Sequence, residues 1–255
     1  MKMRLFFKLT ILLLLIPAAV CSQQARFDEA TFLLEQNEYR KSIDIYKTIA
    51  DDGFHSGGLW LNMGIAYTAL DSLGLAKYYF LQAEQAEETE SKASEALTYV
   101  NERFERRSAV LPQLPWDRFF NFLANRLGTG FLFTLAFILL YGGTAGIITT
   151  WFYPAARSSL LRYSCTGMLI FSGIVFASAF YTDYLETRYG TGVVIDREQA
   201  VYQEPDTDAS TVSTAYEGYV MRVDLAGSRD TPGWSYVRLE NGMYGWVQTG
   251  SMKIF

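Results

Sequence analysis

FLFTLAFILLYGGTAGIITTW fills Phe131–Trp151, and YSCTGMLIFSGIVFASAFYT fills Tyr163–Thr182. Neither stretch contains a charged residue, and each is long enough to cross a hydrocarbon core of about 30 Å as a helix. Arg157 and Arg162 lie between them, with no acidic residue in the same segment. Since short loops rich in Lys and Arg stay in the cytoplasm, the pattern predicts a transmembrane hairpin whose flanking regions both lie outside the cytoplasm.

The N-terminus predicts the same topology. Basic residues precede an apolar run over 9–16 and small residues up to Ser22, which is the pattern of a secretory signal peptide. We expect Cys21 to be removed with this peptide. Acylation of Cys21 is the alternative, and it is disfavoured because Val20, rather than a very small residue, precedes it.

These features divide the chain into parts, and the predicted fold class is a multidomain membrane protein. The parts are a signal peptide (1–22), an all-α domain of two repeats and a capping helix (23–110), a linker with an interfacial helix (111–128), a first span (129–152), a cytoplasmic loop (153–162), a second span (163–182) and a small all-β domain (190–255).

The composition excludes several classes of protein. A net charge of −5, from 22 basic and 27 acidic residues, disfavours binding to nucleic-acid phosphates. One His and two Cys are too few for a multi-thiolate zinc site or a disulfide scaffold. His55 lies in a turn without a nucleophile motif, Cys165 lies in an apolar span, and no phosphate-binding or metalloprotease motif is present. We therefore predict a protein that is not an enzyme and uses no cofactor or metal.

Residues 25–110 predict paired helices with an internal repeat. In the tetratricopeptide pattern, small residues let two helices approach and large residues fill the groove between them. The positions that fit this pattern are Trp60, Met63, Gly64, Tyr67, Leu73, Ala76, Phe80 and Ala83. A shift of 34 residues gives a weaker first copy at Ala30, Leu33, Tyr39, Ser42, Tyr46 and Ile49. A third helix, about 90–107, is expected to cover the second pair.

The first helices of such pairs line a concave groove that accepts peptides. The groove candidates are Phe27, Leu34, Leu61, Asn62, Ile65 and Thr68. The alternative is that these side chains are buried by the third helix or by the segment at Trp116. Nine basic and fifteen acidic residues give 25–110 a net charge of −6, which favours a basic or neutral partner.

The membrane region adds two expectations. An aromatic amphipathic segment over 116–127 follows a Pro-rich break and is expected to lie at the bilayer interface. Small residues in the spans offer helix-packing faces at Gly142 and Gly146 and at Gly173 and Ala177. These faces pack either the two spans on each other or a partner's membrane anchor. Neither span contains Asp, Glu, Lys, Arg or His, which counts against an ion or proton pathway.

Residues 190–255 change to short alternating runs separated by turn residues. Five strands are expected, at 192–195, 200–202, 219–223, 234–239 and 245–247. Five short strands joined by hairpin turns predict a small barrel. This region carries five basic and nine acidic residues.

The run Gly233–Val247, GWSYVRLENGMYGWV, resembles the hairpin that marks bacterial SH3 domains. The resemblance implies an SH3-like barrel that binds peptides or cell-wall stem peptides through aromatic residues. Trp234 and Tyr244 lie beside turns and are the candidates for exposed ligand contacts, whereas Trp246 is expected in the core.

The order of parts carries a second resemblance. A signal peptide, tetratricopeptide pairs, two membrane helices and a terminal SH3 domain resemble the BatE-type proteins of aerotolerance operons. This resemblance implies membrane-anchored von Willebrand A-domain proteins and a MoxR-type ATPase system as partners, without implying a mechanism.

From these features we expect a non-catalytic scaffold in the bacterial inner membrane. Both soluble domains would lie in the periplasm and assemble an envelope protein complex linked to aerotolerance or stress resistance, and two weak modules on one anchor would gain effective concentration. The alternative is a sensor that binds cell-wall peptidoglycan through the SH3 domain. The cytoplasmic loop over 153–162 is short for the output domain of such a sensor.

Overall fold

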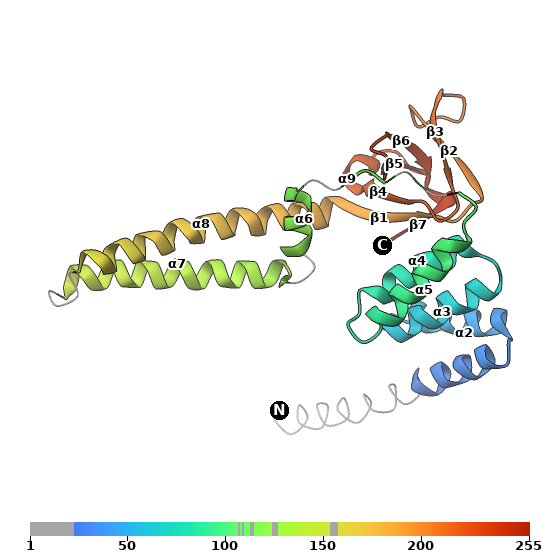
Figure 1. Ribbon diagram of the computed structural model, residues 1–255, viewed down its shortest axis with the longest axis horizontal. Helices are drawn as coiled ribbons and strands as arrows, with labels where there is room; N and C mark the ends of the chain where they lie inside the picture. The colour runs from blue at the N-terminus through green and yellow to red at the C-terminus, as the bar shows by residue number, and fades with distance from the viewer. Residues whose placement is uncertain (1–22, 107, 109, 113–114, 124–126, 154–157) are drawn as a thin grey trace, which may run out of the picture. The chain divides into compact units, whose positions relative to one another are not determined.

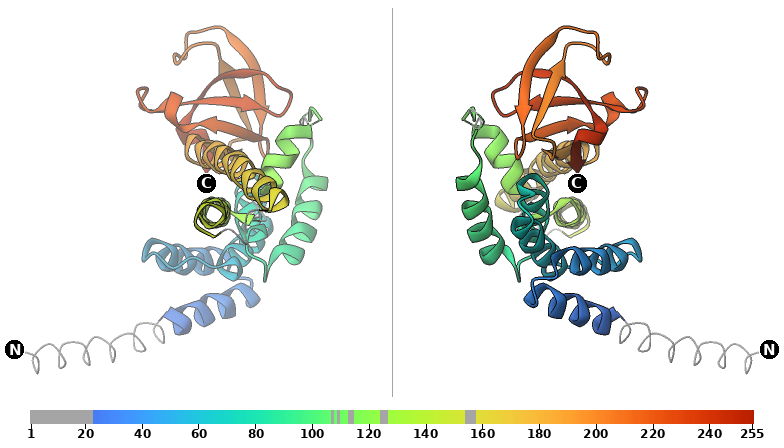
Figure 2. Two further views of the ribbon diagram at one scale, coloured as in Figure 1. Left: turned by 90° about the vertical axis from the view of Figure 1, so that its left-hand side faces the viewer. Right: turned by 90° about the vertical axis from the view of Figure 1, so that its right-hand side faces the viewer.

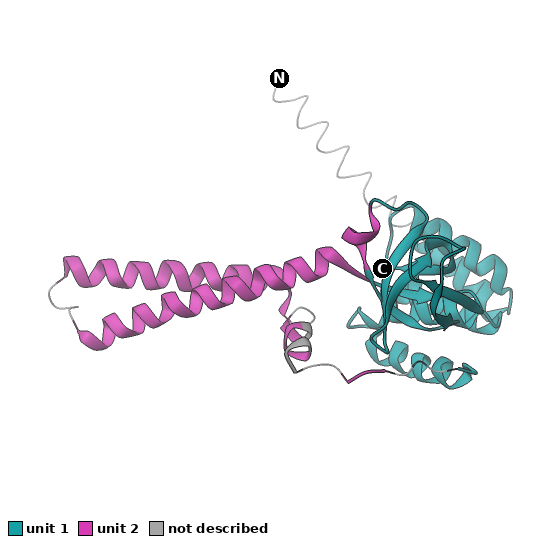
Figure 3. Cartoon of the chain, turned by 90° about the horizontal axis from the view of Figure 1, so that it is seen from above, with its two compact units in different colours: residues 1–109, 191–223, 230–255 teal, residues 110–190, 224–229 magenta. Residues whose placement is uncertain are grey.

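The computed structural model describes residues 23–106, 108, 110–112, 115–123, 127–153 and 158–255. The expected signal peptide with Cys21 and the middle of the expected cytoplasmic loop lie outside these residues. The chain forms two compact units, shown in teal and magenta in Figure 3. Unit 1 contains residues 1–109, 191–223 and 230–255, and unit 2 contains residues 110–190 and 224–229.

The N-terminal part of unit 1 is a series of antiparallel helices, as the sequence predicts (Figure 1). A helix over 23–35 is followed by α2 (Tyr39–Asp51), α3 (Gly57–Ala69), α4 (Leu73–Glu84) and α5 (Glu90–Arg103). Sharp turns separate them: Asn37, Gly53 and Asp71 have positive φ. The Ser56 hydroxyl accepts a hydrogen bond from the Leu59 N–H and so caps α3.

Buried residues of the two helix pairs correspond to one another at the expected repeat length of 34 residues. Tyr46 and Phe80 are the largest fully buried side chains, and they are 34 residues apart. Ala30 and Gly64, also 34 apart, are both buried. A Cβ atom added at Gly64 would lie 2.4 Å from the Phe80 ring, so the close approach of α3 and α4 requires glycine there. Each helix pair therefore has a large buried residue and a small buried residue at corresponding positions, as the repeat pattern predicts.

The C-terminal part of the chain forms a seven-stranded sheet in the order β3-β2-β6-β5-β4-β1-β7. The strands are β1 (Tyr189–Val194), β2 (Glu198–Tyr202), β3 (Thr211–Tyr216), β4 (Val220–Asp224), β5 (Trp234–Leu239), β6 (Tyr244–Gln248) and β7 (Met252–Ile254). The pairs β1·β7, β2·β3, β2·β6 and β5·β6 are antiparallel. The sheet encloses an apolar core that includes Val201, Met221, Val223, Val237 and Val247.

The expected barrel is wrong, because the sheet is not closed. Its two edge strands are β3 and β7, and each has one neighbour in the strand order. The expected set of strands also lacked these two. β3 is rich in Thr and Ser, so it shows no clear apolar alternation, and β7 has only three residues. Two additional strands extend the sheet at its ends without joining them.

Unit 2 contains a long helical hairpin, α7 (Thr129–Phe152) and α8 (Ser159–Arg188), whose helices lie side by side in Figure 1. Both helices are long and apolar enough to cross a membrane. Only 17% and 22% of their most apolar windows are buried, so most residues of these windows are not covered by the part of the chain that the structure describes. The helix α8 also continues past Asp183 and Glu186, further than the expected span.

Two short helices complete unit 2. The helix α6 (Pro115–Phe122) begins at a proline, a favoured residue for the first helical position. Its Phe120 ring lies 4.7 Å from the Tyr181 ring of α8, measured between ring centroids. The helix α9 (Leu225–Ser228) follows β4, and the Asp224 carboxylate accepts a hydrogen bond from the Gly227 N–H at its start.

Candidate interaction surfaces

The groove candidate Asn62 takes part in a polar cluster inside the helix pairs. Its Nδ2 donates to the Tyr46 hydroxyl at 2.8 Å, and the Thr31 hydroxyl lies 2.9 Å from the same oxygen. Tyr46 is fully buried, and burial raises the pKa of its hydroxyl. Asn62 and Thr31 therefore satisfy a buried hydroxyl that would otherwise lack partners.

The other groove candidates differ in exposure. Phe27, Leu34 and Leu61 are half-buried and pack against the core of the helix pairs. The Thr68 hydroxyl donates to the Gly64 carbonyl of its own helix at 2.8 Å. Ile65 is 43% exposed. Of the six candidates, Ile65 thus offers the most accessible side chain to a ligand.

We expect Asn62→Ala to lower the free energy of unfolding by about 1–2 kcal/mol, because the buried Tyr46 hydroxyl loses a hydrogen bond. Chemical denaturation of the full chain in detergent, followed by far-UV circular dichroism, measures this change. In a Tyr46→Phe background the same substitution should cost markedly less. An Asn62→Ala protein as stable as the parent would contradict the structural role.

A second surface is the outer face of the sheet. Strands β2, β5 and β6 turn their aliphatic residues to the core and five aromatic residues to the other side. These residues are Tyr202, Trp234, Tyr236, Tyr244 and Trp246. Four of them are half-buried, and Tyr244 is 51% exposed. We call this set the aromatic face.

The rings of the aromatic face contact one another across strands. Tyr236 lies 5.2 Å from Trp246 and 6.1 Å from Tyr244, and Tyr202 meets Trp234 edge to face at 5.5 Å, all between ring centroids. The Arg238 guanidinium lies 5.4 Å from the Tyr244 ring centroid. Such pairs hold the rings in fixed orientations. The candidates Trp234 and Tyr244 thus belong to one surface.

Trp246 is not in the core, where the sequence analysis placed it. Its neighbours Gly245 and Val247 are buried, and strand alternation therefore turns Trp246 to the aromatic face. Tyr202 and Tyr236 lie on this face too, although neither was a ligand candidate. The sequence does carry a signal for this face, because the aromatic residues of β5 and β6 recur at every second position and must point to the same side of the sheet.

A third surface joins the helix pairs to the sheet inside unit 1. The end of β3 and the start of the turn toward β4 form what we call the docking turn, which consists of Tyr216, Glu217 and Gly218. The Gly74 N–H donates to Glu217 Oε1 at 2.7 Å, and Lys77 Nζ donates to the Gly218 carbonyl at 2.8 Å. Figure 2 shows the helix pairs beside the strands in both views. The two regions of sequence thus meet through specific polar contacts.

Residues after α5 extend this contact. Phe104 ends the helix with an extended backbone and does not continue it to 107, as the sequence analysis expected. Its ring occupies the space where a Gly218 Cβ would lie. Arg106 Nη1 donates to the Tyr216 hydroxyl at 2.8 Å, and its guanidinium lies 4.3 Å from that ring centroid. We call Gly74, Lys77, Phe104 and Arg106 the turn socket.

A depression in the helix pairs is acidic. It measures about 480 Å³ and is lined by Glu84, Glu87, Glu90, Ser91, Ser94, Glu95 and Thr98 of α4, α5 and the segment between them. The net charge of this region favours a basic or neutral partner, and these carboxylates concentrate negative charge in one place.

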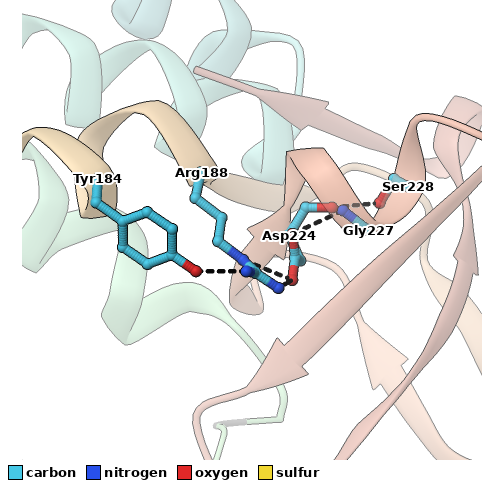
Figure 4. A network of polar contacts seen from close by, with 5 residues as sticks. All are labelled: Tyr184, Arg188, Asp224, Gly227 and Ser228. Carbon is cyan, nitrogen blue, oxygen red and sulfur yellow. Dashed lines mark hydrogen bonds and ion pairs between the residues drawn. The ribbon is translucent and has the colours of Figure 1, made fainter.

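In unit 2, Tyr184, Arg188 and Asp224 form a polar network (Figure 4). Arg188 donates to Asp224 Oδ2 from Nη2 at 2.8 Å and from Nε at 3.2 Å, and it also donates to the Tyr184 hydroxyl. Burial acts to raise the pKa of Asp224. The hydrogen bonds from Arg188 and the Gly227 N–H outweigh this effect and hold the pKa below its usual value.

This network gives stability a pH dependence of known sign. Because the pKa of Asp224 is lower in the folded state, its carboxylate stabilises the fold above the unfolded pKa of about 3.9. That contribution is lost as the pH falls through the lowered pKa. We expect Asp224→Asn to reduce stability by about 1–3 kcal/mol at pH 7. The difference should shrink below pH 4, when thermal unfolding of the full chain in detergent is compared. A difference that grows on acidification would contradict this assignment.

The small-residue faces of α7 and α8 have different surroundings. A Cβ at Gly142 would lie 2.8 Å from Met168 Cε, and one at Gly146 would lie 2.3 Å from Cys165 Sγ. These two glycines pack α7 against α8. A Cβ at Gly173 would have no neighbour within 4 Å among the described residues, and Ala177 is exposed. Hence Gly142 and Gly146 serve the hairpin itself, while Gly173 and Ala177 face away from α7.

His55 and Cys165, the two residues considered for catalysis, both pack against neighbouring residues. His55 stacks on Trp60 at 5.4 Å between ring centroids. Cys165 is 6% exposed and packs against Gly146. In the part of the chain that the structure describes, no three His, Cys, Asp or Glu side chains come together in a way that would hold a metal ion.

Comparison with known proteins identifies no family. No protein-family model matches the chain, and no curated protein matches its sequence.

Proposed function

We propose that this protein is a non-catalytic scaffold of the bacterial inner membrane, which assembles an envelope protein complex outside the cytoplasm. The observation that carries the proposal is the contact between the docking turn and the turn socket. The helix pairs precede the hairpin in sequence and the sheet follows it, yet both belong to unit 1. Two regions that bind each other directly must lie on the same side of a membrane.

The exposed surface of the hairpin supports membrane insertion. Most residues of its apolar windows are not buried within the described part of the chain, unlike those of a core helix of a soluble protein. Exposed aromatic residues lie at both ends of it: Trp151, Tyr153 and Tyr163 near the connection, and Tyr181 and Tyr184 at the other end. Tyr and Trp favour the two membrane interfaces. With Arg157 and Arg162 in the connection, the positive-inside rule supports a cytoplasmic loop and a periplasmic unit 1.

The topology can be tested with single cysteines in a Cys21→Ser, Cys165→Ser background. Ser94→Cys and Thr207→Cys lie at exposed positions of the helix pairs and the sheet, and Ser159→Cys lies at the start of α8. We expect a membrane-impermeant maleimide to label the first two in spheroplasts and the third only after permeabilisation. Labelling of Ser94→Cys and Thr207→Cys on opposite sides would contradict the topology.

The protein-binding part of the proposal rests on the two soluble regions. The 34-residue offset and the Gly64–Phe80 packing support tetratricopeptide pairs, and the β5–β6 hairpin with its aromatic residues supports an SH3-like domain. By resemblance in domain order, the proposed partners are membrane-anchored von Willebrand A-domain proteins and a MoxR-type ATPase system, linked to aerotolerance or stress resistance.

Co-purification tests this function directly. The full-length protein is expressed with a candidate von Willebrand A-domain partner, cross-linked in the membrane and purified in detergent. We expect the partner to be recovered, and Ile65→Glu to reduce the recovery severalfold. Tyr99→Ala, which alters an exposed aromatic residue of α5, is the control. If no protein partner is recovered with cross-linked full-length material, the scaffold function is wrong.

The aromatic face favours one alternative, a sensor that binds cell-wall peptidoglycan. Half-exposed Trp and Tyr rings contact peptides and sugars through their faces, and five of them lie together here. Full-length protein in detergent should then sediment with purified cell wall. Trp234→Ala should abolish this binding, and Tyr99→Ala should not. Absence of sedimentation would remove the alternative.

A further inference from the structure

The docking turn and the turn socket approach closely enough to require glycine on both sides. A Cβ at Gly74 would lie 2.6 Å from the Val194 carbonyl oxygen and 3.0 Å from Ile195 Cα. A Cβ at Gly218 would lie 2.1 Å from the Phe104 ring, and Gly218 has a φ of +78°. A Cβ atom at Gly74 would overlap backbone of the sheet and one at Gly218 would overlap the Phe104 ring, so neither position has room for a side chain. At these two positions the helix pairs and the sheet are thus in direct van der Waals contact.

The contact also completes the hydrogen bonding of α4. Ser72 precedes this helix but its side chain makes no capping hydrogen bond. The Glu217 carboxylate, 143 residues away, accepts from the Gly74 N–H instead. A carboxylate at this position satisfies a free backbone donor and interacts favourably with the helix dipole. The sheet therefore supplies the N-terminal cap that the local sequence does not.

Lys77 depends on the same contact. Its amine donates to the Gly218 carbonyl and lies 5.5 Å from the Phe104 ring centroid. Burial lowers the pKa of Lys77. Without the docking turn this half-buried amine would lose its carbonyl acceptor, which is costly for a charged group.

We propose that the helix pairs and the sheet form one rigid binding platform. In this platform the docking turn stays bound to the turn socket of the same chain, and neither region acts as a separate module. This replaces the picture of two tethered modules. It deepens the scaffold function and rests on that function for what the platform binds.

The platform specifies the kind of partner. Ile65 on the helix pairs and Tyr244 on the sheet are both exposed parts of unit 1. Because the platform is one body, these surfaces keep a fixed spacing. A folded partner domain that contacts both surfaces loses little conformational freedom on binding, whereas tethered modules would have to be ordered first. The platform thus fits a folded protein domain better than two independent flexible peptides.

Hydrogen exchange of the full chain in detergent tests the platform without any partner. Glu217→Lys places a cation at the α4 N-terminus and beside Lys77. We expect it to accelerate exchange of the first α4 amides about tenfold, as loss of a helix cap does. Exchange should also rise at Gly218, whose N–H bonds to the Val194 carbonyl. Glu217→Gln keeps an acceptor and should change these rates less than about twofold.

A second variant covers the case in which Glu217→Lys unfolds the sheet. Phe104→Ala removes the ring from the helix side and leaves the sheet sequence intact. We expect it to raise exchange at Val194 and Gly218. Unchanged exchange there in Phe104→Ala, or unchanged α4 exchange in Glu217→Lys, would overturn the platform. Failure to recover a partner would instead contradict the scaffold function and leave these exchange results standing.

Discussion

Gly64→Ala is expected to lower the free energy of unfolding of the helix pairs by about 2–3 kcal/mol. The added methyl group would lie 2.4 Å from the ring of Phe80, and that ring is 2% exposed and enclosed by the core. The helices α3 and α4 would have to separate to accept it. Far-UV circular dichroism during chemical denaturation of the full chain in detergent measures the change.

Gly58→Ala is the matched control, because it makes the same substitution in the same helix. A Cβ there meets Phe27 at 3.8 Å, an ordinary van der Waals contact. Alanine favours a helix over glycine, so we expect Gly58→Ala to raise stability by about 0.5–1 kcal/mol. Equal effects of the two substitutions would show that α3 and α4 do not pack as described.

Gly146→Leu is expected to disrupt the hairpin. A side chain at this position collides with Cys165, whose Sγ lies 2.3 Å from the Cβ position. Cys165 is buried between the helices. When the helices separate, its thiol becomes accessible, and we expect it to react with a maleimide about tenfold faster. A change of about tenfold corresponds to the free-energy cost of overpacking a core. The measurement uses a Cys21→Ser background in detergent, so that a single thiol reports.

Gly173→Leu should leave the Cys165 reaction rate unchanged, since a Cβ at Gly173 meets no described atom within 4 Å. Increased reactivity in Gly173→Leu, or unchanged reactivity in Gly146→Leu, would exchange the roles of the two small-residue faces and contradict the packing of α7 on α8.

The parts of the fold that could be predicted from the sequence depend on local patterns. The hairpin follows from two uncharged stretches, and the helix pairs follow from a repeat of small and large residues. The open sheet could not be predicted, because β3 lacks apolar alternation and β7 is too short to carry a pattern. Phe104 has helical spacing in the sequence, but its contact with Gly218 stabilises an extended backbone instead.

The residues of the candidate surfaces could likewise be predicted only where a local sequence pattern marks them. Trp234 and Tyr244 were identified from their position beside turns, and strand alternation would also have identified Tyr236 and Trp246. Asn62 shares the helix face of Ile65, and its hydrogen bond to Tyr46 depends on the packing of another helix. The turn socket has no local signal at all, because Gly74 and Glu217 are 143 residues apart.

That separation has a consequence for biosynthesis. At about 5–20 residues per second, the chain between Gly74 and Glu217 takes roughly 7–30 s to make. During this interval the helix pairs have already been made, and the N-terminus of α4 has no cap while the long helices α7 and α8 are synthesised. The nascent chain thus completes unit 1 last, and a delay in making the sheet prolongs the time in which Phe104 and Lys77 are open to chaperones and proteases.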